Sequence, residues 1–247
     1  MGVHRVAIVT GGTRGLGRAI SERLVSEGVA VAAAFHRDHE SAAAWRDSLG
    51  SEVEVSLHSG DLGEVEVCQR LVSEVLERYG RVDYLINNAG SMVEHKLIDI
   101  DPEAWESGLR RNLSSAFYLA QSAIPAMTAQ RFGRIVNVGS VSAAMGSQFQ
   151  VDYASAKAGM VGLSRSLARA VARKGVTVNC VLPGGFETSI LEAMTLTDRS
   201  LIEQSVPVGR FGRPTELAHV VASLLHDQAG YVTGSVIVVD GGMSMGT

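Results

Sequence analysis

The stretch Val6-Ala-Ile-Val-Thr-Gly-Gly-Thr-Arg-Gly-Leu-Gly17 decides the fold, because a short apolar run leads directly into glycines spaced as Gly-x3-Gly-x-Gly. An amphipathic segment follows at once. Glycines between a strand and a helix let the backbone turn tightly and approach a pyrophosphate, whose charge meets free N–H groups of the helix. Tight turns also need glycine without any ligand, so the position between strand and helix is what predicts a nucleotide site.

Short β-branched runs alternate with longer amphipathic segments along the whole chain. The expected strands are Val3–Val9, Val29–Phe35, Glu52–Leu57, Val82–Asn87, Arg134–Val138, Val176–Leu182 and Ser235–Val239. The expected helices are Leu16–Glu27, Glu40–Leu49, Val65–Tyr79, Pro102–Gln130, Asp152–Arg173 and Pro214–Leu225. Strands separated by helices imply right-handed βαβ units. The sequence therefore predicts a Rossmann-type α/β fold, with one doubly wound, seven-stranded parallel sheet and helices on both faces.

A single domain is expected over residues 1–247, because no linker, repeat or shift in composition divides them. The segment from Gly184 to Arg213 breaks the alternation and follows the end of a strand. An insertion at that point lies over the ligand crevice of a doubly wound fold, and we interpret residues 184–213 as a mobile substrate lid. The alternative is an irregular surface loop.

The composition of the chain argues against several classes of function. The net charge of -4 and the lack of a basic stripe argue against a general nucleic-acid binder. Cys68 and Cys180 are the only cysteines; they lack metal spacing, and so few cysteines suit a reducing cytoplasm. No apolar stretch is long enough to cross a membrane. We expect a soluble, cytoplasmic protein without a metal site.

The residues after the second expected strand indicate which nucleotide binds. His36, Arg37 and Asp38 follow that strand, and Arg37 together with Arg14 can clamp a 2′-phosphate through charge-assisted hydrogen bonds. In the alternative, Asp38 reads the ribose hydroxyls and Arg37 is a solvated charge. Because Asp38 stands beyond the strand end, we expect NADP(H). Asp61, after the third strand, either meets the adenine amino group or caps its loop.

Tyr153 and Lys157 are four residues apart in an expected helix, so they project from one face. A lysine ammonium beside a phenol favours phenolate, which predicts that Lys157 lowers the pKa of Tyr153 toward physiological pH. Such a pair is common by chance, and a surface tyrosine packed on a lysine stem is the alternative.

Further motifs set this pair in context, and they occur in a fixed order over essentially the whole chain: Thr10–Gly17, Asn87-Asn88-Ala89-Gly90, Asn112, Ser140, Tyr153-Ala-Ser-Ala-Lys157 and Pro183-Gly184. In order and spacing, the chain resembles the short-chain dehydrogenase/reductase family. The runs Gly133–Val141, Gly175–Asn179 and Val239–Met243 look most like those of the bacterial beta-ketoacyl-acyl-carrier-protein reductases.

The resemblance implies a catalytic set of Asn112, Ser140, Tyr153 and Lys157. Tyr153 would protonate a ketone oxygen while NADPH delivers hydride, and Ser140 would donate a hydrogen bond to the same oxygen. Lys157 would bind the nicotinamide ribose, and Asn112 would kink its helix and hold a water that links Lys157 to solvent. For Ser140, the alternative is a strand-end cap.

The resemblance also implies cofactor contacts from the glycine turn and from the other strand ends. Besides Tyr153 and Lys157, these are Gly11, Thr13, Arg14, Gly15, Leu16, Gly17, His36, Arg37, Asp61, Leu62, Asn88, Ala89, Gly90, Pro183, Gly184 and Thr188. Asn87 and Asn88 have an alternative role, which is to stabilise the sheet alone.

For the substrate, the resemblance implies a beta-ketoacyl thioester on acyl-carrier protein or CoA, and for the assembly a homotetramer. Carrier proteins are acidic, so basic residues are expected near the cleft mouth. Arg131 and Lys174, at the ends of the two long helices, correspond to docking positions in the resembling group. The alternative is that they complement helix dipoles.

Two segments depart from the resembling group. Ser91-Met-Val-Glu-His95 and Gln148-Phe-Gln-Val-Asp152 replace its usual residues, and both border the substrate cleft in the family. A reductase of another ketone, in polyketide-like metabolism, is therefore an alternative function. A non-catalytic NADP(H)-binding sensor is a second alternative, against which the complete catalytic set argues.

Overall fold

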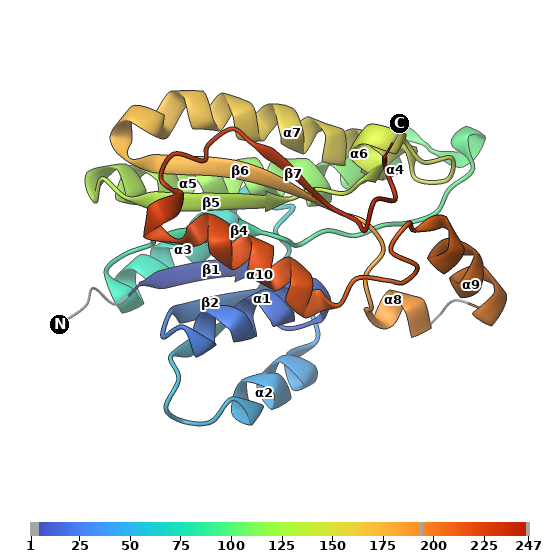
Figure 1. Ribbon diagram of the computed structural model, residues 1–247. Coiled ribbons are helices and arrows are strands. Elements are labelled where there is room, and N and C mark those ends of the chain that lie inside the picture. The colour runs from blue at the N-terminus through green and yellow to red at the C-terminus, as the bar shows by residue number, and fades with distance from the viewer. Residues whose placement is uncertain (1–4, 193–194, 246–247) are drawn as a thin grey trace.

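Seven parallel strands form the centre of the computed structural model, which describes residues 5–192 and 195–245 (Figure 1). The sheet order is β3-β2-β1-β4-β5-β6-β7. The strands are β1 Val6–Thr10, β2 Ala30–Phe35, β3 Val55–Ser59, β4 Tyr84–Asn87, β5 Gly133–Val138, β6 Val176–Pro183 and β7 Val236–Val239. The predicted doubly wound α/β fold is confirmed, and the strand order reverses between β1 and β4.

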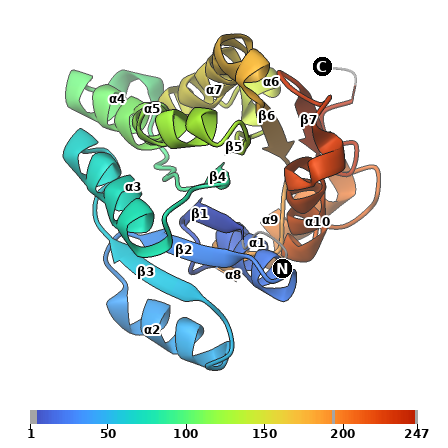
Figure 2. The same cartoon turned by 90° about the vertical axis from the view of Figure 1, so that its left-hand side faces the viewer.

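Helices cover both faces of the sheet (Figure 2). They are α1 Gly15–Ser26, α2 His39–Ser48, α3 Val65–Tyr79, α4 Pro102–Leu109, α5 Ser115–Ala129, α6 Ser142–Met145, α7 Val151–Val171, α8 Ser189–Glu192, α9 Leu196–Ser205 and α10 Pro214–Leu225. Helices α1, α2 and α10 pack on one face, and α3, α5 and α7 pack on the other. Successive residues of β1 alternate between these two cores, which explains why the strand is apolar throughout.

Three predicted elements differ from the structure. The long helix expected over Pro102–Gln130 is interrupted by a π-helical turn at Arg110–Ser114. The strand expected over Glu52–Leu57 is observed as β3, Val55–Ser59. Its residues pair with β2 from Val31 opposite Val55 to Phe35 opposite Ser59. Residues 3 and 4 of the first expected strand lie outside the described part, and β1 runs on to Thr10.

The segment at 184–213 contains two short helices, α8 and α9, which the sequence pattern did not predict. Its two ends are tied together by a bridge between Phe186 and Gly212, where the N–H of Glu187 donates to the carbonyl of Gly212 at 2.9 Å. The beginning and the end of the segment therefore lie side by side. Its mobility and closure over a substrate stay predictions.

Among the described residues, no helix combines the length and the apolar character needed to cross a membrane. The same part of the chain holds no cluster of three His, Cys, Asp or Glu side chains arranged to bind a metal ion.

Candidate active site

The carboxyl ends of β1, β4, β5 and β6 meet at one edge of the sheet, on the right in Figure 1. The glycine turn, the Asn87–Gly90 motif, Ser140 and Pro183-Gly184 each follow one of these strands. This edge includes the point between β1 and β4 where the strand order reverses, which is where doubly wound folds bind ligands.

The glycine turn requires glycine at particular positions. Gly11 and Gly15 have φ values of 62° and 53°, in the left-handed region that favours glycine. A Cβ atom at Gly17 would collide with the carbonyl oxygen of Gly11 and the side-chain amide of Asn88. Arg14 begins helix α1 with an extended backbone and without a side-chain cap, so the turn presents free helix N–H groups.

Asn88 braces this turn. The Oγ1 atom of Thr10 accepts hydrogen bonds from the N–H groups of Asn88 at 2.9 Å and Ala89 at 2.8 Å. The Nδ2 atom of Asn88 donates to the carbonyl of Thr10 at 2.9 Å. Thr10 was not assigned a role from the sequence, although a buried threonine ending an apolar strand was the available signal. Asn88 has the structural role that was the alternative, and its direct cofactor contact stays a prediction.

Asn87 lies in the sheet and faces away from the turn. Its Nδ2 atom donates to Oδ1 of Asn137 at 2.8 Å, and Nδ2 of Asn137 donates to the Ser164 hydroxyl at 2.8 Å. This buried chain of polar groups connects β4, β5 and α7, so Asn87 stabilises the sheet.

The charged residues Asp38, Arg14 and Arg37 differ in how they are engaged within the chain. Asp38 accepts a hydrogen bond from the N–H of Ser41 at 3.1 Å, which caps α2 and lowers the pKa of Asp38. Its carboxylate is thus already engaged by its own helix. The side chains of Arg14 and Arg37 are exposed, and neither forms a hydrogen bond or ion pair with a residue that the structure describes.

Asp61 takes the loop-capping role that was its alternative. Its Oδ1 atom accepts from the N–H of Gly63 at 2.9 Å, and its Oδ2 atom lies 3.8 Å from Nε2 of His36. Leu62, the next residue, packs against the core beneath α3. Contact of His36, Asp61 and Leu62 with a cofactor stays a prediction.

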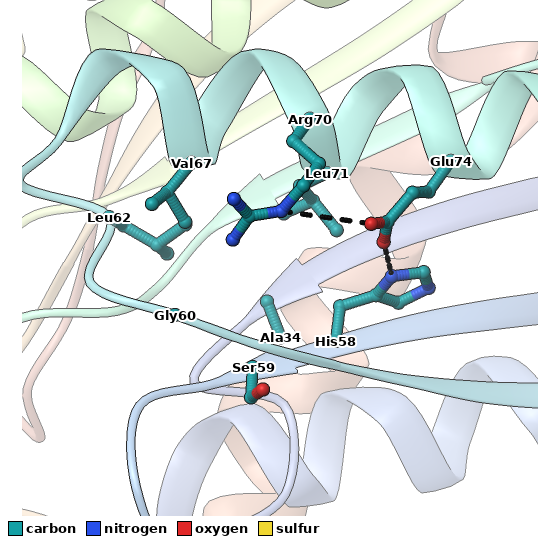
Figure 3. A pocket seen from close by; sticks show the side chains of 9 residues that line it. All are labelled: Ala34, His58, Ser59, Gly60, Leu62, Val67, Arg70, Leu71 and Glu74. Atoms are coloured by element: carbon teal, nitrogen blue, oxygen red, sulfur yellow. Dashed lines mark hydrogen bonds and ion pairs between the residues drawn. The ribbon is translucent and has the colours of Figure 1, made fainter.

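A small pocket beside this turn, shown in Figure 3, lies between β3 and α3. His58 lines one end of it and forms hydrogen bonds with Ser56 at 2.9 Å and Glu74 at 2.8 Å. The pocket has a volume of about 10 Å³, which is room for about one water molecule. Apart from Leu62, it contains no predicted site residue, so it is not the candidate active site.

Two of the predicted catalytic residues, Asn112 and Lys157, lie next to Gly90. A Cβ atom there would lie 2.6 Å from Oδ1 of Asn112 and 3.4 Å from Nζ of Lys157. The Nζ atom of Lys157 donates to the carbonyl of Val138 at 2.8 Å and lies 5.5 Å from the centre of the Tyr153 ring. Tyr153 and Lys157 therefore share a face of α7, as their spacing predicts.

The pKa shifts of Tyr153 and Lys157 differ from those that the sequence predicts. Burial raises the pKa of Tyr153, and hydrogen bonding with Ser140 opposes that shift. Burial lowers the pKa of Lys157 to about 8. The prediction that Lys157 lowers the pKa of Tyr153 is thus not confirmed, because burial has the largest effect on both pKa values and the Lys157 ammonium donates to the carbonyl of Val138.

Ser140 forms hydrogen bonds with two residues, Ser142 and Tyr153. Its hydroxyl donates to the Ser142 hydroxyl at 3.1 Å and accepts from the N–H of Ser142 at 3.2 Å, so it also caps the turn that begins α6. Both the cap and the contact with Tyr153 are present.

Asn112 lies in the π-helical turn, which confirms the predicted break in its helix. It is fully buried, and its Nδ2 atom donates to the carbonyls of Ser91 at 2.8 Å and Gly108 at 3.0 Å. Its Oδ1 atom accepts from the N–H of Ser91 at 3.1 Å. Asn112 thus fixes the segment after Gly90, a role that the sequence did not reveal because the partner is 21 residues away.

The remaining predicted cofactor residues complete the same edge. A Cβ atom at Gly15 would lie 3.7 Å from Cγ2 of Thr188, so the start of the 184–213 segment reaches the glycine turn. Pro183 ends β6, and its carbonyl accepts from the N–H of Val141 at 3.0 Å. Gly184 packs against Asp240, where a Cβ atom would not fit. Thr13 and Leu16 are half-buried within the turn.

Arg131 and Lys174 are not near the cleft of their own chain. They precede β5 and β6, whereas Ser140 follows β5, so they lie at the opposite edge of the sheet. A Cβ atom at Gly175 would collide with the carbonyl oxygen of Arg131, which brings the two basic residues together. The expected position at the cleft mouth is wrong, because a helix that feeds a parallel strand must end at the amino edge of the sheet.

Comparisons with known proteins agree with this geometry. A family model described as Enoyl-(Acyl carrier protein) reductase matches residues 11–244. The 3-oxoacyl-[acyl-carrier-protein] reductase FabG of Escherichia coli (strain K12) is 40% identical over 242 residues, 98% of each chain. Nodulation protein G of Azospirillum brasilense is 38% identical over 98% of each chain. The FabG protein of Haemophilus influenzae is 37% identical over 97% of this chain and 98% of its own.

Proposed function

This chain belongs to the short-chain dehydrogenase/reductase family, and we propose that it uses NADPH to reduce a beta-ketoacyl thioester to the beta-hydroxyacyl form. The observation that carries the proposal is the position of Tyr153, which is hydrogen-bonded with Ser140 and has the Nζ atom of Lys157 5.5 Å from its ring centre, at the same sheet edge as a glycine turn with free helix N–H groups. The names of the similar reductases support an acyl thioester as the substrate.

The residues at this edge fit a dinucleotide, because the start of α1 has no side-chain cap and glycine lets the backbone of the turn approach a phosphate closely. Bound NADPH supplies the hydride that goes to the carbonyl carbon. Tyr153 gives its phenolic proton to the carbonyl oxygen, which becomes the new hydroxyl group. The Ser140 hydroxyl donates to the same oxygen while negative charge develops on it.

Lys157 and Asn112 support this proton transfer. The Lys157 ammonium would hold the ribose hydroxyls of the bound cofactor, through which Tyr153 regains a proton. Asn112 fixes Ser91, and through it the backbone at Gly90 that Lys157 packs against. A water held near Asn112 completes the path by which Tyr153 regains its proton.

NADPH is favoured over NADH by the charges after β2. Arg14 and Arg37 are exposed and make no side-chain hydrogen bond among the described residues, so they would bind a 2′-phosphate, while Oδ1 of Asp38 caps α2. We place the enzyme in the cytoplasm, which suits its two free, buried cysteines.

We also propose a homotetramer that receives its substrate from an acidic carrier protein or from CoA. Arg131 and Lys174 lie at the edge opposite Tyr153, so they serve a carrier only if a second copy places its active site beside them. Without such a neighbour, their positive charge complements the carboxyl ends of α5 and α7.

A panel of substrates tests the reaction. The wild-type protein is assayed with acetoacetyl thioesters, crotonyl thioesters, a diketone and a quinone, each with NADPH and with NADH. We expect the ketoacyl thioesters and NADPH to give the highest kcat/KM. Preference for the crotonyl thioester would instead favour the enoyl reductase for which the family model is named, and preference for the diketone would favour a reductase of another ketone.

Tyr153→Phe tests the assigned acid. Removing the phenolic proton donor should lower kcat by about 10²- to 10⁴-fold, while NADPH affinity measured by fluorescence titration stays within about twofold. Tyr231→Phe, at a fully exposed tyrosine before β7, is the matched control and should leave both values unchanged. A large loss of NADPH affinity in Tyr153→Phe would contradict the role of Tyr153 as an acid.

A further inference from the structure

Hydrogen bonds join the segment that follows Gly90 to the segment that precedes Tyr153. The N–H of His95 donates to the carbonyl of Phe149 at 2.8 Å, and Nε2 of Gln150 donates to Oε1 of Glu94 at 3.4 Å. The Ser147 hydroxyl donates to Oε1 of Gln150 at 3.3 Å. Residues 91–95 and 142–150 therefore form one structure, here called the rim. These contacts join segments that lie 54 to 56 residues apart in the sequence.

The rim is anchored directly to the catalytic site. Its first residue, Ser91, exchanges two hydrogen bonds with Asn112. Ser142, which begins α6, is bonded to Ser140 through both its N–H and its hydroxyl. At its other end, the rim leads into α7, which carries Tyr153 in its first turn. A group bound to the rim would thus be continuous with a ketone held at Ser140 and Tyr153.

Four large apolar side chains of the rim face solvent. Met92 is 39% exposed, Val93 48%, Met145 45% and Phe149 47%. Single exposed apolar residues are ordinary, but four from two joined segments beside one site are characteristic of a surface that binds an apolar ligand.

The charges of the rim indicate which part of a substrate it binds. Glu94 and His95 are its only ionisable residues, and Glu94 is engaged by Gln150. The rim has no lysine or arginine to attract the phosphates of CoA or of a carrier's prosthetic group. Its surface therefore suits the hydrocarbon end of the acyl group rather than the thioester end.

We propose that the rim binds the acyl chain of the substrate, so that this enzyme prefers medium-length beta-ketoacyl thioesters to acetoacetyl thioesters. The inference rests on the proposed reaction and adds its substrate class. Phe149 and Met92 are the residues that would determine specificity. A methylene fully removed from water gives about fourfold in kcat/KM, so an eight-carbon substrate, whose four additional methylenes are half covered by the rim, should exceed a four-carbon one by about tenfold.

The experiment compares acetoacetyl-CoA with 3-oxooctanoyl-CoA in the wild-type enzyme and in two pairs of variants. Phe149→Ser and Met92→Ser remove apolar surface, while Phe149→Leu and Met92→Leu keep most of it and serve as matched controls. The bond to His95 uses the backbone carbonyl of Phe149, so these side-chain changes leave it in place. Each serine variant should raise KM for the eight-carbon substrate about fivefold to tenfold, whereas KM for acetoacetyl-CoA, whose acyl chain is shorter, should rise by less than about twofold.

The outcomes separate this inference from the proposed reaction. If the wild-type enzyme reduces neither thioester, the proposed function fails. If it reduces both with equal kcat/KM, or if the serine variants weaken both substrates alike, the reaction stands and the rim is not an acyl-chain site.

Discussion

Lys157 shows how one buried charge affects both chemistry and stability. The residue is 2% exposed, and the carbonyl of Val138 is the hydrogen-bond acceptor of its ammonium. Burial lowers its pKa in the folded protein to about 8, from 10.5. Between these values, the unfolded chain binds more protons than the folded one, so the stability contributed by Lys157 rises as pH increases from 8 toward 10.5 and is lowest below pH 8.

Lys157→Met should therefore change stability in a pH-dependent way. Between pH 7 and pH 10, the free energy of unfolding of the variant should fall by about 2 to 3 kcal/mol relative to that of the wild type. The reason is that only the wild type loses a buried charge over that range. Urea unfolding at the two pH values measures the difference. Lys96→Met, at an exposed lysine, is the control and should show the same stability relative to the wild type at both. A difference for Lys157→Met that did not vary with pH would contradict the lowered pKa of Lys157.

At the scale of elements, helices α4 and α7 approach closely at Gly108. The glycine is buried, and a Cβ atom there would collide with the Asp152 carboxylate. Asp152 is the residue before Tyr153, so the packing of α4 sets where the catalytic turn of α7 lies.

Gly108→Ala should destabilise the protein although alanine favours helices. The helix propensity gain is at most about 1 kcal/mol, whereas overpacking costs about 1 to 3 kcal/mol. Thermal or urea unfolding measures the net loss. In an Asp152→Ala background, where the carboxylate is absent, the same substitution should cost less. Additive effects of the two changes would show that Gly108 and Asp152 do not compete for space.

At the scale of the whole molecule, one face of α7 has space for a neighbour. Ser155, Ala158 and Gly162 are exposed, and a Cβ atom at Gly162 would meet nothing within 4 Å in its own chain. In the proposed homotetramer, helices of a second copy cover this face, and small residues permit their close approach.

Gly162→Leu is then expected to disrupt the assembly without unfolding the chain. The native mass should fall from about four times 26.1 kDa to a smaller species, measured by light scattering, while circular dichroism remains unchanged. Ser73→Leu adds the same bulk to the exposed face of α3 and should keep the tetramer. A tetramer that persists in Gly162→Leu would show that copies do not pack on this face of α7.

The sequence by itself determined the features that depend on local geometry. Alternating apolar periods predicted the parallel sheet, glycine spacing predicted the phosphate turn, and the four-residue interval placed Tyr153 and Lys157 on one helix face. Those signals are local, since they reflect the repeat of a helix or strand and the lack of a Cβ atom in glycine.

Only the tertiary structure decided which distant groups meet. It placed the carbonyl of Val138 under Lys157, and it joined His95 to Phe149. It also moved Arg131 away from the cleft of its own chain. Such contacts depend on how strands and helices pack, which no period along the chain records, and burial in that packing sets the pKa values of Tyr153 and Lys157.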